Sequence, residues 1–283
     1  MIAAVPFPYP FELGFMQRAL VAGVVVGIFA PLIGTFLVQK RMSLVGDGIG
    51  HVAFAGIGAG LFAGIYPVWP ALVFAIAGAL GVEWLRARGK AGGDLALALF
   101  FYSGIALGVV FASAGGGIGT GLFGYLFGQP LTVKPAEIVL IVALGVVVVS
   151  AIVGLRRVLF AVVTDEDWSR IAGLPVGGAN ALLAVLTAVA VVASMQVVGI
   201  LLVAALMVLP VASAQLLGGS FAATLRWAVA VGVGAVVAGL AVSRIWGLAP
   251  GGTIVLVAAV IFLAIAAIRR SVPGGIATEV PER

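Results

Sequence analysis

An aspartate and the single histidine of the chain stand four residues apart in the segment MSLVGDGIGH, residues 42 to 51. Carboxylate oxygen and imidazole nitrogen both bind metal ions and carry protons, so Asp47 and His51 are the first candidates for chemistry. If the segment is helical, positions i and i+4 share one face, with their Cβ atoms about 5 to 6 Å apart. Both side chains could then reach one ion.

The composition around this pair is that of a polytopic membrane protein. Of the 283 residues, 63% are hydrophobic and only 9% are charged, and apolar runs recur along almost the whole length. The 41 glycines fit this class, because small residues let transmembrane helices pack closely. With no cysteine in the sequence, a metal ion would need oxygen and nitrogen ligands. The net charge of +5 does not indicate nucleic-acid binding, since the basic residues fall in short clusters between apolar runs.

Nine apolar windows approach the length of about 20 residues that crosses a bilayer. They cover residues 16–38, 48–65, 68–86, 95–113, 136–155, 179–194, 197–216, 225–243 and 252–268. The sequence therefore predicts an all-α fold with eight or nine transmembrane helices. The number stays open because only Ser194, Met195 and Gln196 interrupt the stretch 179–216, which could be one long span plus a partial helix. The apolar segment GLFGYLFG is too short to span and is expected to form a re-entrant or interfacial helix.

Five groups of basic residues set the expected topology, because cytoplasmic loops carry an excess of lysine and arginine. The groups are Lys40 with Arg41, Arg86 with Arg88 and Lys90, Arg156 with Arg157, Arg226, and Arg269 with Arg270. Placing all five in the cytoplasm predicts nine crossings, an outer N-terminus and an inner C-terminus. We expect an N-terminal interfacial segment at 1–15, a transmembrane domain at 16–270 and a flexible cytoplasmic tail at 271–283, in a multi-pass protein of a prokaryotic plasma membrane.

The segment TDEDWSRIAGLP predicts a short cytoplasmic helix. Thr164 is expected to cap it, and Asp165, Glu166 and Asp167 in the first turn suit the positive end of the helix dipole. Gly173 is expected to end the helix. A plain structural helix is the simpler interpretation, and a docking surface for another chain is the alternative.

Other polar and proline residues have structural explanations. Glu83 lies close enough in sequence to Arg86 to pair with it along a helix. Asp94 stands at an expected helix start. Pro31 and Pro210 interrupt apolar segments and are expected to kink or end helices.

The Asp/His pair itself has a structural alternative. Asp47 could cap the helix start, and His51 could hydrogen-bond to a neighbour near the membrane interface. Ala55 and Gly58 continue the same face, and their small size suits either a narrow pathway or a close contact with another helix. Spacing alone leaves the two roles equal. Ionisable residues in a membrane are costly and usually functional, which favours a functional role.

The sequence also lacks the motifs of other functions. It contains no Gly-x-x-x-x-Gly-Lys-Ser/Thr phosphate loop, no His-Glu-x-x-His motif and no second histidine for a hydrolytic metal centre. These absences argue against an enzyme and leave a transporter, driven either by a separate ATPase or by an ion gradient. No second copy of the Asp/His segment and no clear repeat is present, which makes the gradient-driven mechanism the second choice.

A family resemblance covers nearly the whole chain. It begins at residues 15–56, FMQRALVAGVVVGIFAPLIGTFLVQKRMSLVGDGIGHVAFAG, which resemble the N-terminal signature of the membrane permeases of zinc, manganese and ferrous-iron ABC importers. That signature runs from Phe-Met-x-Arg-Ala to Arg-Met-Ser-x-x-Gly-Asp-x-x-x-His. The resemblance continues in LFGYLFG, DEDWSRIAGL and VVGILLVAALMVLPVASAQLL. The departures are Gly50 in place of a serine, Phe54 and Ala55 in place of Leu-Pro, and Ser169 in place of an alanine.

The resemblance implies a homodimer that binds two cytoplasmic ATPase subunits and receives metal from an extracytoplasmic metal-binding protein. Membrane lipid surrounds it, no nucleic acid is involved, and no cofactor is bound permanently. Zinc, manganese or ferrous iron is the implied substrate. Two copies paired across a two-fold axis would bring together two aspartates and two histidines, a set that suits tetrahedral zinc and could serve manganese or iron with added water.

We therefore predict an ATP-driven importer permease for a divalent transition metal, with an ion-gradient-driven secondary metal transporter as the alternative. Asp47 and His51 are the predicted metal ligands. Pro210 is expected to end a helix, and the residues after it are expected to form a short amphipathic turn facing the ATPase. The predicted coupling segment consists of Pro210, Val211, Ala212, Ser213, Ala214, Gln215, Leu216, Leu217, Gly218, Gly219 and Ser220.

Overall fold

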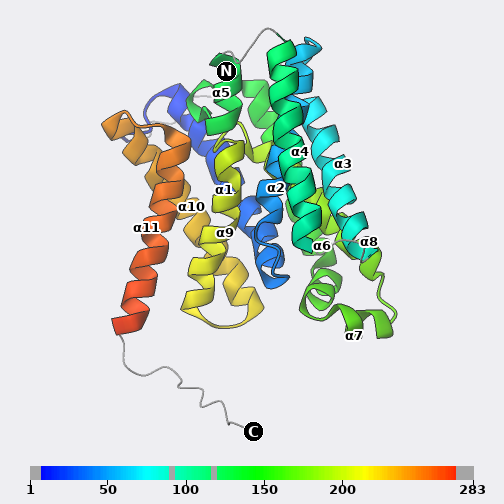
Figure 1. The fold of residues 1–283 in the computed structure, drawn as a ribbon. Helices are drawn as coiled ribbons and strands as arrows, with labels where there is room; N and C mark the ends of the chain where they lie inside the picture. The colour runs from blue at the N-terminus through cyan, green and yellow to red at the C-terminus, as the bar shows by residue number, and fades with distance from the viewer. Residues whose placement is uncertain (1–7, 89–92, 116–119, 272–283) are drawn as a thin grey trace.

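The computed structural model describes residues 8–88, 93–115 and 120–271, and these residues form the expected all-α fold (Figure 1). The helices are α1 (Gly14–Gln39), α2 (Val45–Phe62), α3 (Val68–Ala87), α4 (Gly93–Ala114), α5 (Thr120–Phe127), η1 (Pro130–Thr132), α6 (Pro135–Thr164), α7 (Glu166–Ile171), α8 (Val176–Ser194), α9 (Ile200–Leu217), α10 (Phe221–Trp246) and α11 (Pro250–Ser271). Within the described ranges, nine of them are long and apolar enough to cross a membrane. Lys90, residues 1–7 of the expected interfacial segment and residues 272–283 of the expected tail lie outside the described residues.

The ambiguous stretch 179–216 forms two separate helices, each long and apolar enough to cross a membrane, which agrees with the nine-span prediction and not with one long span plus a partial helix. Helix α8 ends at Ser194, and the chain reverses through a short, mostly buried turn before α9 begins at Ile200. Gly199 makes this reversal possible, because its φ of 93° lies in a region that side chains other than glycine rarely adopt.

The short apolar segment predicted at GLFGYLFG is the eight-residue helix α5. It lies against α9 at the end of the bundle opposite α7 (Figure 1). The backbone N–H of Gln129 donates to the carbonyl oxygen of Gln196, 3.0 Å away, and links the end of α5 to the turn between α8 and α9. Helix α5 therefore covers that turn.

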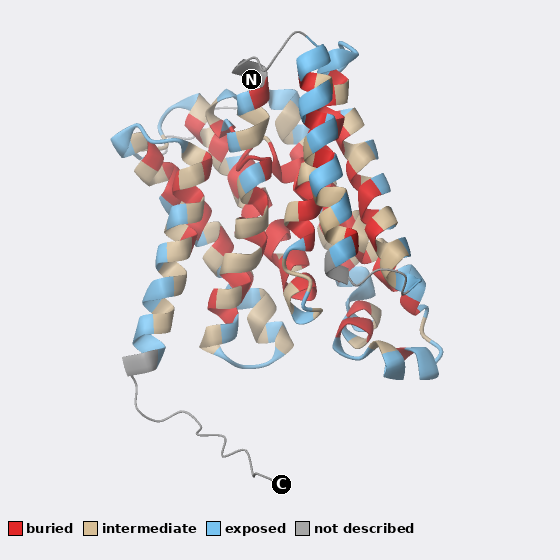
Figure 2. Ribbon diagram, in the orientation of Figure 1, coloured by how far each residue is buried: buried red, intermediate tan, exposed pale blue. Residues whose placement is uncertain are grey.

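Helices α1, α2 and α8 are the most buried of the spans, whereas only 22% of the residues in the apolar windows of α4, α6 and α11 are buried (Figure 2). Helix α1 packs closely on α9, because a Cβ atom at Gly34 would lie 1.9 Å from the carbonyl oxygen of Met207. This contact is the close approach that small residues allow between membrane helices. It fixes the distance between α1 and α9, and α9 in turn contacts α2.

Both prolines singled out in the sequence lie inside continuous helices. Pro31 is within α1, and Pro210 is within α9, which continues to Leu217. The expectation that Pro210 ends a helix is therefore wrong. Proline removes only one helical hydrogen bond, and packing against neighbouring helices can retain the helix beyond it. The first part of the predicted coupling segment is consequently helical.

The short helix α7 forms at the predicted place but with a different cap. Helix α6 continues through Thr164, whose hydroxyl donates to the carbonyl oxygen of Phe160, 2.8 Å away. Asp165 is the cap instead, because its Oδ1 atom accepts the backbone N–H of Trp168 at 2.9 Å. The prediction of Thr164 as the cap was wrong by one residue.

Two smaller predictions are confirmed. The Arg86 guanidinium donates to both carboxylate oxygens of Glu83 at 3.0 Å, along one face of α3. Helix α4 begins at Gly93, which places Asp94 in its first turn. The opposite charges of Glu83 and Arg86, three residues apart, stabilise α3 near its end.

Candidate functional site

Asp47 and His51 lie one turn apart at the beginning of α2, on one face as predicted. The distance between Asp47 Oδ1 and His51 Nε2 is 3.9 Å. That is too long for a hydrogen bond. Two ligands that each lie about 2.1 Å from a shared ion can be up to ~4.2 Å apart, so the observed separation leaves room for a metal between them. Leu44 is the N-cap residue of α2, so Asp47 does not cap the helix.

Helix α4 shields the histidine side of the pair. The His51 ring packs against Phe101, with ring centroids 4.2 Å apart and an interplanar angle of 62°. The His51 side chain is only 12% exposed, whereas that of Asp47 is 34% exposed. In the single chain, therefore, the imidazole is largely enclosed and the carboxylate is open on one side.

Small residues continue the face of α2 that carries Asp47 and His51, and they allow a close contact with another helix. A Cβ atom at Gly58 would lie 2.8 Å from the carbonyl oxygen of Gly108 on α4. Of the two interpretations offered by the sequence, a narrow pathway or a close contact, the structure has the close contact here. It holds α4 firmly against the helix that carries Asp47 and His51.

One chain supplies an incomplete ligand set. Across residues 8–88, 93–115 and 120–271, no group of three or more histidine, aspartate or glutamate side chains is placed to hold a metal ion. Structural zinc sites use four ligands. Asp47 and His51 of one chain could thus supply at most two ligands to an ion between them.

A polar network that the sequence analysis did not identify lies at the other end of α2. The Tyr66 hydroxyl, in the turn after α2, donates to Glu137 Oε1 at 2.9 Å and accepts the Gln196 side-chain amide at 2.9 Å. Burial is the main reason that the pKa of Tyr66 is raised, so the phenol remains a donor. The only sequence signal was the position of Tyr66 and Gln196 as polar residues between apolar windows.

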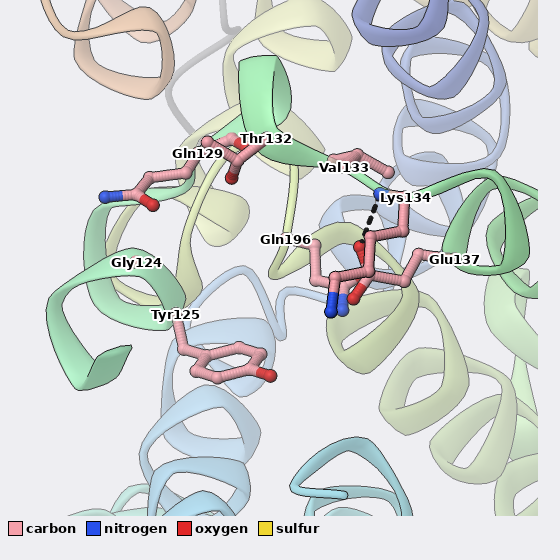
Figure 3. A pocket seen from close by; sticks show the side chains of 8 residues that line it. All are labelled: Gly124, Tyr125, Gln129, Thr132, Val133, Lys134, Glu137 and Gln196. Carbon is pink, nitrogen blue, oxygen red and sulfur yellow. Dashed lines mark hydrogen bonds between the residues drawn. The ribbon is translucent and has the colours of Figure 1, made fainter. Parts of the chain in front are cut away.

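This network borders a cavity of about 270 Å³ at the end of the bundle near α5 (Figure 3). The backbone N–H of Lys134 donates to Glu137 Oε2 at 2.8 Å, which holds the carboxylate at the start of α6. The lining residues are Gly124, Tyr125, Gln129, Thr132, Val133, Lys134, Glu137 and Gln196. Because Tyr66 follows α2 and Asp47 begins it, the cavity and the Asp/His pair lie at opposite ends of that helix.

The predicted coupling segment divides into a helical part and a turn. Residues 210–217 are the last two turns of α9, and residues 218–220 connect α9 to α10. Val211 and Ala214 are buried against Ala228, whereas Gln215 and residues 218–220 are exposed. Only the exposed residues are available to another chain.

The nine candidate spans among the described residues define the chain as a multi-pass membrane protein, and sequence comparison identifies its family. The ABC 3 transport family matches residues 12–269, and the chain belongs to this family. This result confirms the resemblance to the membrane permeases of metal ABC importers.

Individual relatives agree with the family assignment. The chain is 31% identical to the manganese transport system membrane protein MntC of Listeria innocua, over 89% of each chain. It is 30% identical to the manganese import system permease protein ScaB of Streptococcus gordonii, over 88% of this chain and 89% of that protein. Among solved structures, PsaBC from Streptococcus pneumoniae in complex with Fab matches with a TM-score of 0.81 and 30% identity, over 90% of this chain and 91% of the other.

Proposed function

We propose that this chain is the membrane permease of an ATP-driven importer for a divalent transition metal, with manganese, zinc or ferrous iron as the substrate. The observation that carries the proposal is the separation of 3.9 Å between Asp47 and His51, in a family whose relatives transport manganese. Carboxylate and imidazole together can bind any of these three ions. An extracytoplasmic metal-binding protein delivers the ion at the outer face.

A second copy of the chain completes the site. Two copies related by a two-fold axis raise the ligand count from two to four, which is the number that a tetrahedral ion requires. The open side of the Asp47 carboxylate supports this arrangement, because it leaves the pair accessible to a neighbouring subunit. The number of bound ions tests it directly, since a shared site binds one ion per two chains and separate sites bind two.

The end of the bundle that carries α7 faces the cytoplasm in this proposal. Among the described residues, four of the five predicted basic groups lie at or near that end of the bundle. They are at the ends of α1, α3 and α11 and near the start of α10. Arg156 and Arg157 lie in the last third of α6, which descends to the same end (Figure 1). Cytoplasmic loops favour this excess of positive charge.

Two exposed elements at that end are candidates for contact with the ATPase subunits. One is the exposed part of the predicted coupling segment, at Gln215 and residues 218–220. The other is α7, on which Trp168 is 61% and Ile171 is 87% exposed. Large apolar side chains so exposed outside the spans suit the interface with another protein.

The experiment that tests the proposal compares energy sources. The permease is reconstituted in proteoliposomes with its partner ATPase, and uptake of Mn²⁺, Zn²⁺ and Fe²⁺ is measured with and without ATP. We expect uptake of at least one ion to need ATP and a hydrolysis-competent ATPase, and to continue when ion gradients are dissipated. Uptake that needs no ATP and stops with a protonophore would instead identify the gradient-driven alternative.

A further inference from the structure

One carboxylate at the beginning of α7 joins three spans. Glu166 Oε1 lies 2.7 Å from Lys40 Nζ, 3.1 Å from Arg86 Nη2 and 3.2 Å from the side-chain amide nitrogen of Asn180. Lys40 also donates to the Asn180 side-chain oxygen. These donors follow α1, end α3 and begin α8, respectively. We call these four residues the Glu166 cluster.

The Glu166 cluster is sheltered from water more than an ordinary surface ion pair. The side chains of Lys40 and Glu166 are 7% and 31% exposed, and Asn180 is buried. Charge-assisted hydrogen bonds in such surroundings are stronger than those between fully solvated groups. Removing one partner leaves the other charges poorly compensated. The cluster is therefore a firm connection and not a loose surface contact.

Helix α7 meets the bundle through its direct connection to α6, through the buried Ser169 and through Glu166. Helix α7 has only six residues, and its large apolar side chains Trp168 and Ile171 point into solvent. Among these contacts, Glu166 at the first position of the helix is the one that joins α7 to the residues that follow α1, end α3 and begin α8. The cluster thus lies where α7 meets the spans.

Through Lys40, the Glu166 cluster is also close in sequence to Asp47 and His51, the proposed metal ligands. Lys40 begins the turn between α1 and α2, and Asp47 follows in the first turn of α2. Within this turn, Arg41 has a φ of 59°, the single non-glycine residue with a positive φ in the described ranges. This left-handed residue ends α1 in a common way, because the backbone N–H of Met42 donates across it to the carbonyl oxygen of Leu37 at 2.8 Å. The turn is therefore a short, hydrogen-bonded connection between Lys40 and the base of α2.

We propose that Glu166 is a positioning residue that carries movement of α7 through Lys40 and Arg86 to the base of α2. This inference rests on the proposed function, in which ATPase subunits press on the cytoplasmic end. When α7 moves, Lys40 moves with it, and the short turn after Lys40 carries the displacement to the start of α2 and its Asp47–His51 pair. Glu166 acts through other residues and does not touch the metal.

Coupled transport measurements in proteoliposomes test this role. Glu166→Gln keeps the shape of the side chain but removes its charge. We expect ATP hydrolysis to stay within about twofold of the parent while the number of metal ions imported per ATP falls by about tenfold, the size of effect expected for one sheltered charged contact. Lys40→Met should have the same effect, and the double variant should be no worse than either single variant, because the two residues act as a unit.

A matched control separates this role from general effects of charge. Asp167→Asn removes the next carboxylate in the sequence, which is exposed and outside the cluster, and should leave the ratio of metal to ATP unchanged. A purely structural Glu166 would lower hydrolysis and uptake in proportion, and that result would overturn the proposal. If Glu166→Gln does not assemble, Lys40→Met, which leaves the Arg86 pair intact, decides the question by the same ratio.

A distance measurement gives an independent readout. Because the sequence has no cysteine, spin labels can be attached at Leu44→Cys and Ile171→Cys, both exposed positions. In the parent, this distance should stay constant between nucleotide-free and ATP-bound states, because both labels move together. In Glu166→Gln, the distribution of distances between the two labels should broaden or shift on ATP binding. If Glu166→Gln shows unchanged distances and the parental ratio of metal to ATP, the inference is disproved. If the parent protein imports no metal together with its ATPase, the proposed function is refuted instead.

Discussion

The carbonyl oxygen of His51 on α2 faces Gly104 on α4 so closely that a Cβ atom at residue 104 would lie only 2.7 Å from it. The absence of a side chain at this glycine therefore sets the distance between α4 and the helix that carries Asp47 and His51. Because Phe101 on the same helix packs on the His51 ring, a shift of α4 would also disturb the imidazole.

Gly104→Ala is expected to push α4 away from α2 and lower both stability and uptake. Overpacking of this kind typically costs about 1 to 3 kcal/mol. Thermal unfolding in detergent and metal uptake in proteoliposomes measure the two effects. Gly234→Ala on α10 is the matched control, since a Cβ atom there meets nothing within 4 Å. A Gly104→Ala protein that melts and transports like the Gly234→Ala protein would contradict the close-contact argument.

Cysteine labelling tests the direction of the chain in the membrane. Arg170 on α7 is exposed, so Arg170→Cys should resist an impermeant thiol reagent in intact cells and react once the cells are opened, if α7 is cytoplasmic. The adjacent Ser169 is unsuitable, because it is fully buried. Thr132→Cys, exposed at the opposite end of the bundle, should react in intact cells. The reverse pattern would invert the proposed topology.

The proposed contact at the end of α9 predicts different outcomes for neighbouring residues. Gln215→Arg changes an exposed side chain and should uncouple ATP hydrolysis from uptake while the permease remains folded. Ala214→Arg would place a charge in a fully buried position and should prevent folding, so it does not report on coupling. Ala87→Arg, exposed at the same end of the bundle, is the control. Parental uptake and metal-stimulated hydrolysis in Gln215→Arg would remove α9 from the coupling contact.

The pH dependence of stability follows from the surroundings of Glu166. Burial alone would raise its pKa, but hydrogen bonds and charges from Lys40 and Arg86 lower it from 4.5 to about 2. A lowered folded-state pKa stabilises the protein above the unfolded value, and this contribution is lost as pH falls from about 4.5 towards 2. The difference in melting temperature between parent and Glu166→Gln should therefore be constant from about pH 5 to 8 and shrink below about pH 4.5. A difference that already shrinks near neutral pH would contradict this assignment.

The local features of the sequence predicted the spans and the helical face of Asp47 and His51, because hydropathy and helical periodicity are local properties. Contacts between segments that are distant in the sequence could not be predicted from it. Nothing in the sequence paired Glu166 with Lys40, more than a hundred residues apart, or brought Tyr66 to Gln196. The helix end expected at Pro210 was wrong for the same reason, since packing by neighbouring helices decides whether a helix continues past a proline.

The metal role of Asp47 and His51 predicts that each residue is indispensable for uptake. Asp47→Ala and His51→Ala should each reduce uptake of the transported ion by about 100-fold or more, as expected for the loss of a ligand from a site with so few. Expression, dimerisation and ATPase binding should remain near normal. The double variant should be no worse than either single variant if the pair acts as a unit. Uptake should also fall as pH drops, because neutral imidazole is the form that binds metal.

His51→Gln separates metal binding from packing against Phe101. Glutamine keeps much of the volume and the hydrogen-bonding capacity of the side chain but lacks the imidazole, so this variant should be as inactive as His51→Ala. Metal uptake and the number of ions bound per permease, measured together, distinguish the two roles. If His51→Gln imports Mn²⁺, Zn²⁺ and Fe²⁺ at the parental rate, the histidine fills space beside α4 and does not bind the travelling ion.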